Sequence, residues 1–296
     1  MLKGPEMGMR EKGAEKEVDA SRQTVLASLE RIGFHEVLCE KVIDRLALLE
    51  KHSRFNQYSR RIEGGMEKVL ESLEEYHALK YPEIKRSERQ RLDGCVAAIL
   101  HDIGKSGPVD ATPEEQRMII RIFAQEEIRD LKMPISEAVS KIFGENEVVG
   151  ILQMLERHAI KGTMPMREFW DKHAQWTHDN LERYPQGLSE HARIIAGSHH
   201  IDRDVDPYKL LESEIPLDAR LIGTLEEYME ALEGRALIAL DQYEAATTRG
   251  GLSHKEAIVW VRKNIAKHKD DKLMELALKV IDELGAKNAL FSADFA

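Results

Sequence analysis

Apolar positions recur every three or four residues along most of this chain, which is the period of an amphipathic α-helix. One such series runs from Leu26 to Leu49, and another runs from Ile62 to Tyr76. No segment of useful length alternates between apolar and polar residues, as a half-buried strand would. The pattern therefore predicts an all-α fold.

Residues typical of helix starts precede several of these apolar runs. Thr112 is followed by Pro113 and then by Glu115, which is a capping box with proline at the first helical position. Ser253 also has an acidic residue three positions later. In the segment MPISEAVSKIF we expect Ser136 to cap a further helix.

Composition and turn residues suggest how these helices are organised. Residues 1–21 are charged and contain several glycines, so we expect a mobile tail. Residues 22–57 are predicted to form an N-terminal helical layer. The later helices are predicted to form one bundle, and residues 202–216 form a long polar link within it.

Charge and cysteine content narrow the class of protein. The formal net charge of the 296 residues is −10 and no stripe of Lys and Arg stands out, so we expect no nucleic-acid partner. The only cysteines, Cys39 and Cys95, do not suggest a disulfide framework. Residues 1–20 lack the apolar stretch of a signal peptide, so we expect none, and no apolar run approaches the roughly 20 residues of a membrane span. We expect a cytoplasmic protein without a membrane partner.

Three apolar stretches end in residues that can bind a metal ion. His101 and Asp102 follow VAAIL, His199 and His200 end IIAGSHH, and Asp241 follows ALIAL. A buried carboxylate is costly unless it is paired, hydrogen-bonded or bound to a metal. Neighbouring residues on a helix point about 100° apart, so a doublet can serve two ions. Imidazole and carboxylate donors together suit Fe, Mn, Co or Zn.

A fourth candidate, His173, lies in the segment FWDKHAQWTHDNL. The tryptophans Trp170, Trp176 and Trp260 have helical spacing with other apolar positions, so we expect them in the core. The remaining histidines mostly stand among charged residues and are expected at the surface: His35, His52, His77, His158, His178, His191, His254 and His268.

The segment HDIGK, residues 101–105, resembles a motif of the HD superfamily of metal-dependent phosphohydrolases and, within it, of the HD-GYP branch. The resemblance covers about residues 58–265 with gaps. It implies an HD-type metal-binding helical domain over residues 58–290. Residues 108–168 would be an insertion in this domain, serving as a lid, a partner surface or a dimer contact.

The resemblance also implies roles for individual residues. Asp102, Lys105 and Arg249 would be catalytic, with Lys105 and Arg249 holding phosphate oxygens. Two divalent ions are expected, and the implied metal ligands are His101, Asp102, His173, His199, His200 and Asp241.

The chain departs from the family pattern at two informative places. Tyr58 stands where the family has a metal-binding histidine and is a possible site residue at that first position. One metal position would then be weakened, lost or bound through the phenolate of Tyr58. The Gly-Tyr-Pro signature after the paired histidines is absent, which removes the best argument for cyclic di-GMP as the substrate.

Four interpretations follow from the sequence. The leading one is hydrolysis of a phosphoester or phosphodiester by a metal-activated water, on a small phosphorylated substrate such as a nucleotide or cyclic dinucleotide. The second is a non-catalytic sensor or scaffold with this fold. The third is a di-iron oxygenase, resembling myo-inositol oxygenase. The last is that the His and Asp residues merely pair with each other in the core. The sequence leaves the oligomeric state open, and a homo-oligomer is one possible state.

Overall fold

The computed structural model describes residues 20–52, 55–80, 87–125, 128, 130–200, 225–265 and 272–291. Within these ranges every regular element is a helix, and the sole β-type contact is an isolated bridge between Pro134 and Pro165. The predicted all-α fold is confirmed.

The first helix covers residues 20–31, so the last two residues of the predicted tail are already helical. The polar link at 202–216 lies outside the described residues. The further helices are α2 (Glu40–His52), α3 (Phe55–Lys80), α4 (Glu88–Leu100), α5 (Pro113–Phe123), α6 (Ile135–Phe143), α7 (Glu145–Arg157), α8 (Met166–Arg183), α9 (Glu190–Gly197), α10 (Leu225–Glu244), α11 (His254–Ile265) and α12 (Lys272–Ala286), with short turns η1 (Ile103–Ser106) and η3 (Ala245–Arg249).

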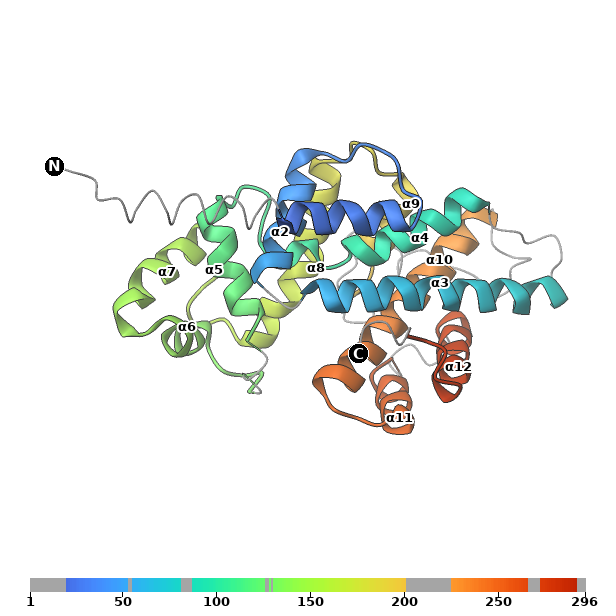
Figure 1. The fold of residues 1–296 in the computed structure, drawn as a ribbon. Coiled ribbons are helices and arrows are strands. Elements are labelled where there is room, and N and C mark those ends of the chain that lie inside the picture. The colour runs from blue at the N-terminus through green and yellow to red at the C-terminus, as the bar shows by residue number, and fades with distance from the viewer. Residues whose placement is uncertain are drawn as a thin grey trace.

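The larger hydrophobic core lies among α3, α4, α9, α10 and α12. Helix α3 packs against α4 and α10, and α10 also packs against α9 and α12 (Figure 1). The apolar positions predicted from the sequence point into this core, including Ile62, Met66 and Val69 of α3, each at most 2 % exposed. Helices α4 and α10 are thus each packed against both α3 and α9.

The segment 108–168 contributes a second hydrophobic core at one end of the molecule, where α5, α6 and α7 lie together (Figure 1). This core continues into α8 through Phe169 and Trp176. Because α8 also carries His173, the packing of these three helices bears directly on the position of a candidate ligand.

The helix starts agree with the sequence at two of three places. The Thr112 side chain accepts from Glu115 N and the Glu115 carboxylate accepts from Thr112 N, as the predicted capping box requires. Glu256 likewise accepts from Ser253, just before α11. The prediction for Ser136 is wrong. Helix α6 begins at Ile135, and the amide of Ser136 donates to the Gly162 carbonyl, so a neighbouring loop satisfies the helix start.

The tryptophans differ in burial. Trp176 is 6 % exposed and lies in the second core, and Trp170 is half-buried. The prediction that Trp260 belongs to the core is wrong, because it is 39 % exposed. Helix α11 turns Ala257, Ile258 and Val261 inward, whereas Val259 and Trp260 face outward.

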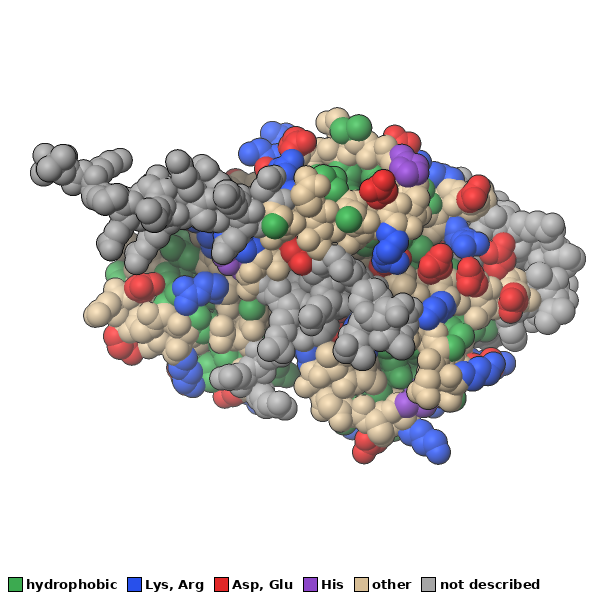
Figure 2. Space-filling model, in the orientation of Figure 1, with side chains coloured by type: hydrophobic (Ala, Val, Ile, Leu, Met, Phe, Trp, Pro, Cys, Tyr) green, Lys and Arg blue, Asp and Glu red, His purple; other side chains and the backbone are tan. Residues whose placement is uncertain are grey.

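The surface carries charges of both signs. On the face in Figure 2, Lys and Arg are interspersed with Asp and Glu among the described residues. None of the described helices combines the length and the apolar character that crossing a membrane requires.

Candidate metal centre

Helix α4 delivers the first two candidate ligands. Its residues Cys95 to Leu100 are buried, and His101 follows as the C-cap residue. Asp102 comes next, as the N-cap residue of the short turn η1. The apolar run seen in the sequence therefore places an imidazole and a carboxylate inside the bundle, where His101 is 1 % and Asp102 6 % exposed.

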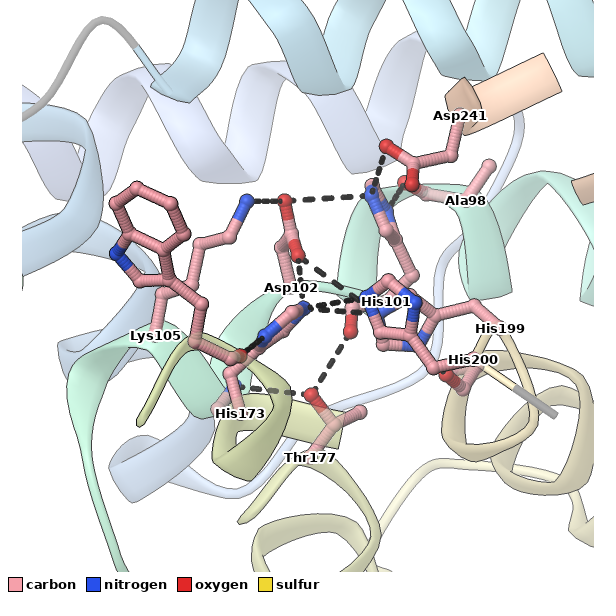
Figure 3. Close-up of polar contacts among 12 residues, drawn as sticks. Ala98, His101, Asp102, Lys105, His173, Thr177, His199, His200 and Asp241 are labelled. Carbon is pink, nitrogen blue, oxygen red and sulfur yellow. Dashed lines mark hydrogen bonds and ion pairs between the residues drawn. The ribbon is translucent and has the colours of Figure 1, made fainter. Parts of the chain in front are cut away.

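Four separate segments meet at this point (Figure 3). His173 comes from α8, His199 and His200 follow α9, and Asp241 comes from α10. None of these residues is more than 8 % exposed. The structure thus brings together six residues that are spread over 141 positions between His101 and Asp241.

Three histidine nitrogens lie close enough to share one ion. His173 Nε2 lies 3.1 Å from His199 Nε2 and 3.0 Å from His200 Nε2. Two nitrogens bound to one ion at a right angle, each about 2.1 Å from it, lie about 3.0 Å apart. This group can hold a metal ion.

The backbone fixes the tautomer of three histidines. The Nδ1 atoms of His101, His173 and His199 each lie against the carbonyl oxygen of the residue three positions earlier, at 2.8 Å for His101 and 2.7 Å for His199. A carbonyl only accepts, so each Nδ1 carries the proton. In the neutral imidazole, Nε2 is then unprotonated and directs its lone pair into the cluster, as in metal-binding histidines.

Asp102 lies between two groups of donors. Its Oδ1 is 3.0 Å from His173 Nε2 and 3.7 Å from His199 Nε2. Its Oδ2 is 3.4 Å from His101 Nε2, which in turn lies 3.8 Å from an oxygen of Asp241. The two carboxylate oxygens therefore face different donor groups, an arrangement compatible with a bridge between two ions.

The cluster perturbs the acidity of its own members. Burial would lower the pKa of His101, but Asp102 and Asp241 outweigh it and raise that pKa to about 10. Burial would raise the pKa of Asp102, but Lys105 and His101 hold it well below its usual range. Burial and the nearby His101 and His173 lower the pKa of His199. The carboxylates thus stay ionised by attracting positive charge, which a divalent ion would also supply.

The two predicted phosphate-binding residues are placed differently. Lys105 Nζ pairs with Asp102 Oδ2, and its side chain is 20 % exposed at the edge of the cluster. Arg249 ends η3, is exposed, and has no described contact with the cluster. Burial would raise the pKa of Asp241, but the hydrogen bond and charge of His101 lower it. The charge of Arg249 also lowers that pKa, to a smaller degree. The side chain of Tyr58 lies outside the described residues.

Thr177 and Gly104 join the ligand-bearing segments. Thr177 Oγ1 donates to the His101 carbonyl at 2.8 Å and accepts from Gly104 N at 3.0 Å. A methyl group at Gly104 would lie 2.0 Å from the His173 carbonyl oxygen. Glycine is therefore required where η1 crosses α8, which gives the glycine of HDIGK a physical reason.

Glu244 was not predicted as part of this region. It is 1 % exposed, one turn after Asp241, and accepts from Thr248 Oγ1 at 2.7 Å. Arg61 Nε lies 3.8 Å from the same carboxylate. Its position three residues after Asp241, on one helical face, was the available signal.

Two histidines expected at the surface are buried instead. His191 is 7 % exposed and pairs with the fully buried Glu233 at 2.5 Å. The side chain of His158 is 6 % exposed and lies 3.5 Å from Glu115. The charged residues next to His191 and His158 in the sequence suggested exposure. Both side chains are buried because carboxylates from other helices, Glu233 and Glu115, lie beside them.

A comparison of the chain with protein-family models, curated proteins and solved structures found no match. The function is therefore argued from the site alone. What the structure establishes is a buried histidine and aspartate cluster that can bind metal, in an all-α fold.

Proposed function

We propose that this chain is a metal-dependent phosphohydrolase of the HD type, acting on a phosphoester or phosphodiester. One observation carries the proposal: the Nε2 atoms of His101 and His173 lie against the two different oxygens of a buried Asp102, with the ammonium of Lys105 at the partly exposed edge. A buried core pair needs no such convergence, since one donor and one acceptor would satisfy each other.

The donor set fits two divalent ions. His173, His199 and His200 with Asp102 would hold one, and His101 and Asp241 with the second oxygen of Asp102 would hold the other. Such ions lower the pKa of bound water and neutralise charge on phosphoryl oxygens. Fe, Mn, Co and Zn all suit these donors.

The remaining charged residues would bind the substrate. Lys105 has a flexible stem and an ammonium that reaches the cluster from its exposed edge, so it would hold a non-bridging phosphate oxygen. Arg249 is exposed on the Asp241 side and would bind a phosphate oxygen there. A small phosphorylated substrate, such as a nucleotide or cyclic dinucleotide, suits this pair of cations.

The test compares the wild-type chain with Lys105→Met after reconstitution with Mn²⁺ or Fe²⁺. The probe is bis(4-nitrophenyl) phosphate, and metal content is measured in parallel. We expect Lys105→Met to keep its metal and lose about 100-fold in kcat. Lys141→Met is the control, since Lys141 pairs with Glu137 at the surface. If Lys105→Met lost its metal to the same extent as its turnover, Lys105 would hold the cluster together instead of binding the substrate.

Two other functions predict different results. A sensor or scaffold would bind metal and a phosphorylated ligand without turnover. A di-iron oxygenase is compatible with the histidine-rich donor group, and it would show a mixed-valent iron signal and consume oxygen.

A further inference from the structure

An arginine of the N-terminal layer reaches the segment that follows the HD doublet. Arg45 lies on α2 and is 3 % exposed. Its guanidinium donates to Ser106 Oγ at 2.9 Å, and to the carbonyl oxygens of Ser106 at 3.4 Å, Gly107 at 3.1 Å, Pro108 at 2.7 Å and Val109 at 2.9 Å.

All hydrogen bonds of Arg45 among the described residues thus go to one short loop, residues 106–109. Burial lowers the pKa of Arg45 to about 10, so the guanidinium still carries its charge at neutral pH. Hydrogen bonds from a charged donor are roughly twice as strong as neutral ones. The planar fork of arginine can reach several carbonyls at once, which the compact ammonium of lysine cannot.

The same loop is also held by α8. Asn180 Nδ2 donates to the Gly107 carbonyl at 3.1 Å, so Gly107 is shared between Arg45 and Asn180. Gly107 has a φ of +93°, a conformation that other residues rarely adopt. The loop therefore depends on its partners for its shape, and Lys105 immediately precedes it.

Helix α2 also contacts α5, the first helix of the segment 108–168. Leu48 and Leu49 pack with Ile120 of α5 in a small separate hydrophobic cluster. The N-terminal layer thus contacts both the loop after Lys105 and the first helix of the segment 108–168. Its position fits a support for the site better than an independent domain.

We propose that Arg45 is a positioning residue: it fixes the loop 106–109 and thereby holds Lys105 beside Asp102. The effect on turnover rests on the proposed phosphohydrolase function. The effect on the loop and on Lys105 does not rest on it.

The test uses the full-length chain with Arg45→Ala and Arg45→Lys, each with guanidinium or ammonium added at millimolar concentration. Three quantities are measured: hydrogen exchange of the peptide covering residues 103–109, the acylation rate of Lys105 by mass spectrometry, and Mn²⁺-dependent hydrolysis of bis(4-nitrophenyl) phosphate. Arg22→Met is the matched control, because Arg22 pairs with Asp44, the residue before Arg45, and has no described contact with the loop.

In Arg45→Ala we expect exchange of the loop to rise roughly tenfold and Lys105 to acylate faster. Metal content stays at the wild-type level, while kcat falls by about 100-fold with a smaller change in KM. Guanidinium restores all three measurements towards wild type, and ammonium does not. Arg45→Lys covers the case in which Arg45→Ala does not fold, because it keeps the positive charge. It lacks the planar fork of arginine, so we expect the same changes in exchange, acylation and turnover.

Unchanged exchange and acylation in both variants would overturn the proposal. So would equal rescue by ammonium and guanidinium, because the geometry of the fork would then be irrelevant. If the wild-type chain does not hydrolyse the probe, the phosphohydrolase function fails, but exchange and acylation still decide the role of Arg45.

Discussion

Asp102 faces nitrogen donors on both sides, and this is the residue-scale feature on which the proposed chemistry depends. Oδ1 lies 3.0 Å from His173 Nε2, whereas Oδ2 lies 3.4 Å from His101 Nε2. An amide of the same size can replace the carboxylate without leaving a cavity. The amide would lack the negative charge with which Asp102 attracts a cation next to either group of nitrogen donors.

We expect Asp102→Asn to lose bound metal and hydrolytic activity together while remaining helical. Metal content by plasma mass spectrometry, turnover and circular dichroism check this result. Asp93→Asn is the control, because Asp93 is a buried acid of α4 that pairs with Arg89 away from the cluster. An Asp102→Asn protein that hydrolyses the probe as fast as wild type would exclude the metal mechanism.

Thr177 tests the support of the ligands rather than the ligands themselves. Thr177→Val leaves the His101 carbonyl and the Gly104 amide without their shared partner. We expect metal affinity to fall about 10- to 100-fold and unfolding free energy to fall by about 1–3 kcal/mol. Metal titration and urea unfolding measure these effects.

Thr247→Val is the matched control for that experiment, since among the described residues Thr247 Oγ1 donates only to carbonyls of its own helical turn. Wild-type metal affinity in Thr177→Val would show that the hydroxyl is dispensable for the site.

For single residues, the sequence predicted which side chains are candidate ligands better than it predicted which side chains are buried. The HDIGK motif and the paired histidines stand out because ligand-type residues end apolar runs. The burial of His191 could not be predicted, since Glu233, its partner, is 42 positions away and reached only through the packing of α9 on α10.

At the scale of elements, α8 joins the two hydrophobic cores. Phe169 and Trp176 face the core of the segment 108–168, and His173 faces the cluster. Phe123 of α5 stacks on Phe169 and meets the His173 ring edge-on at 5.8 Å. Helices α5 to α7 therefore help to orient a ligand.

Helix α5 also carries a pH-dependent contact. Burial opposes ionisation of Glu115, but hydrogen bonds from Thr112 and Arg157 lower its pKa from 4.5 to about 2. Because the folded pKa is depressed, the stabilisation is complete above about pH 4.5 and is lost as the pH falls towards 2.

We expect the urea midpoint of Glu115→Gln to lie below that of the wild-type chain. The difference should be largest above about pH 4.5 and should shrink below about pH 4. Glu114→Gln is the control, because the Glu114 side chain is 68 % exposed. A difference between Glu115→Gln and wild type that grows on acidification would contradict the sign of this linkage.

Helix starts show what local sequence can predict. Thr112 caps α5 because all partners lie within four residues. The segment around Ser136 gives no sign that another group takes the place of a side-chain cap. The first amides of α6, those of Ile135 and Ser136, donate to the carbonyls of Met164 and Gly162, far along the chain. Local patterns fail where a distant loop takes the place of a side chain.

At the scale of the whole molecule, the cluster is a junction of helices that pack in different directions. Helices α4, α8, α9 and α10 each contribute at least one candidate ligand, directly or through the turn that follows. An ion bound by all of them would stabilise the folded state over the unfolded chain. Metal removal should therefore loosen the whole bundle.

We expect a strong chelator to lower the melting temperature of metal-loaded wild-type protein by roughly 5–10 °C. The reason is that the ion binds the folded chain and has few preorganised donors in the unfolded one. Scanning calorimetry measures the shift, with Asp102→Asn as the control that chelator should leave unchanged. An identical melting temperature with and without chelator would argue against a site that spans the bundle.

The all-α class was predictable because helical periodicity is local and repeated. The arrangement was not: the contacts of Arg45 with residues 106–109 and the shared core of α5 to α8 join segments whose sequences carry no mutual signal. The resemblance to the HD superfamily supplied the ligand grouping, and His173 would have been a weak candidate without it.

The most direct test of the account is the metal content per chain, measured by plasma mass spectrometry on protein purified anaerobically without a metal-chelating tag. We expect about two divalent ions per wild-type chain and almost none in Asp102→Asn. A wild-type content no higher than that of Asp102→Asn would contradict it, and the histidines and aspartates would then be a buried polar cluster without an ion.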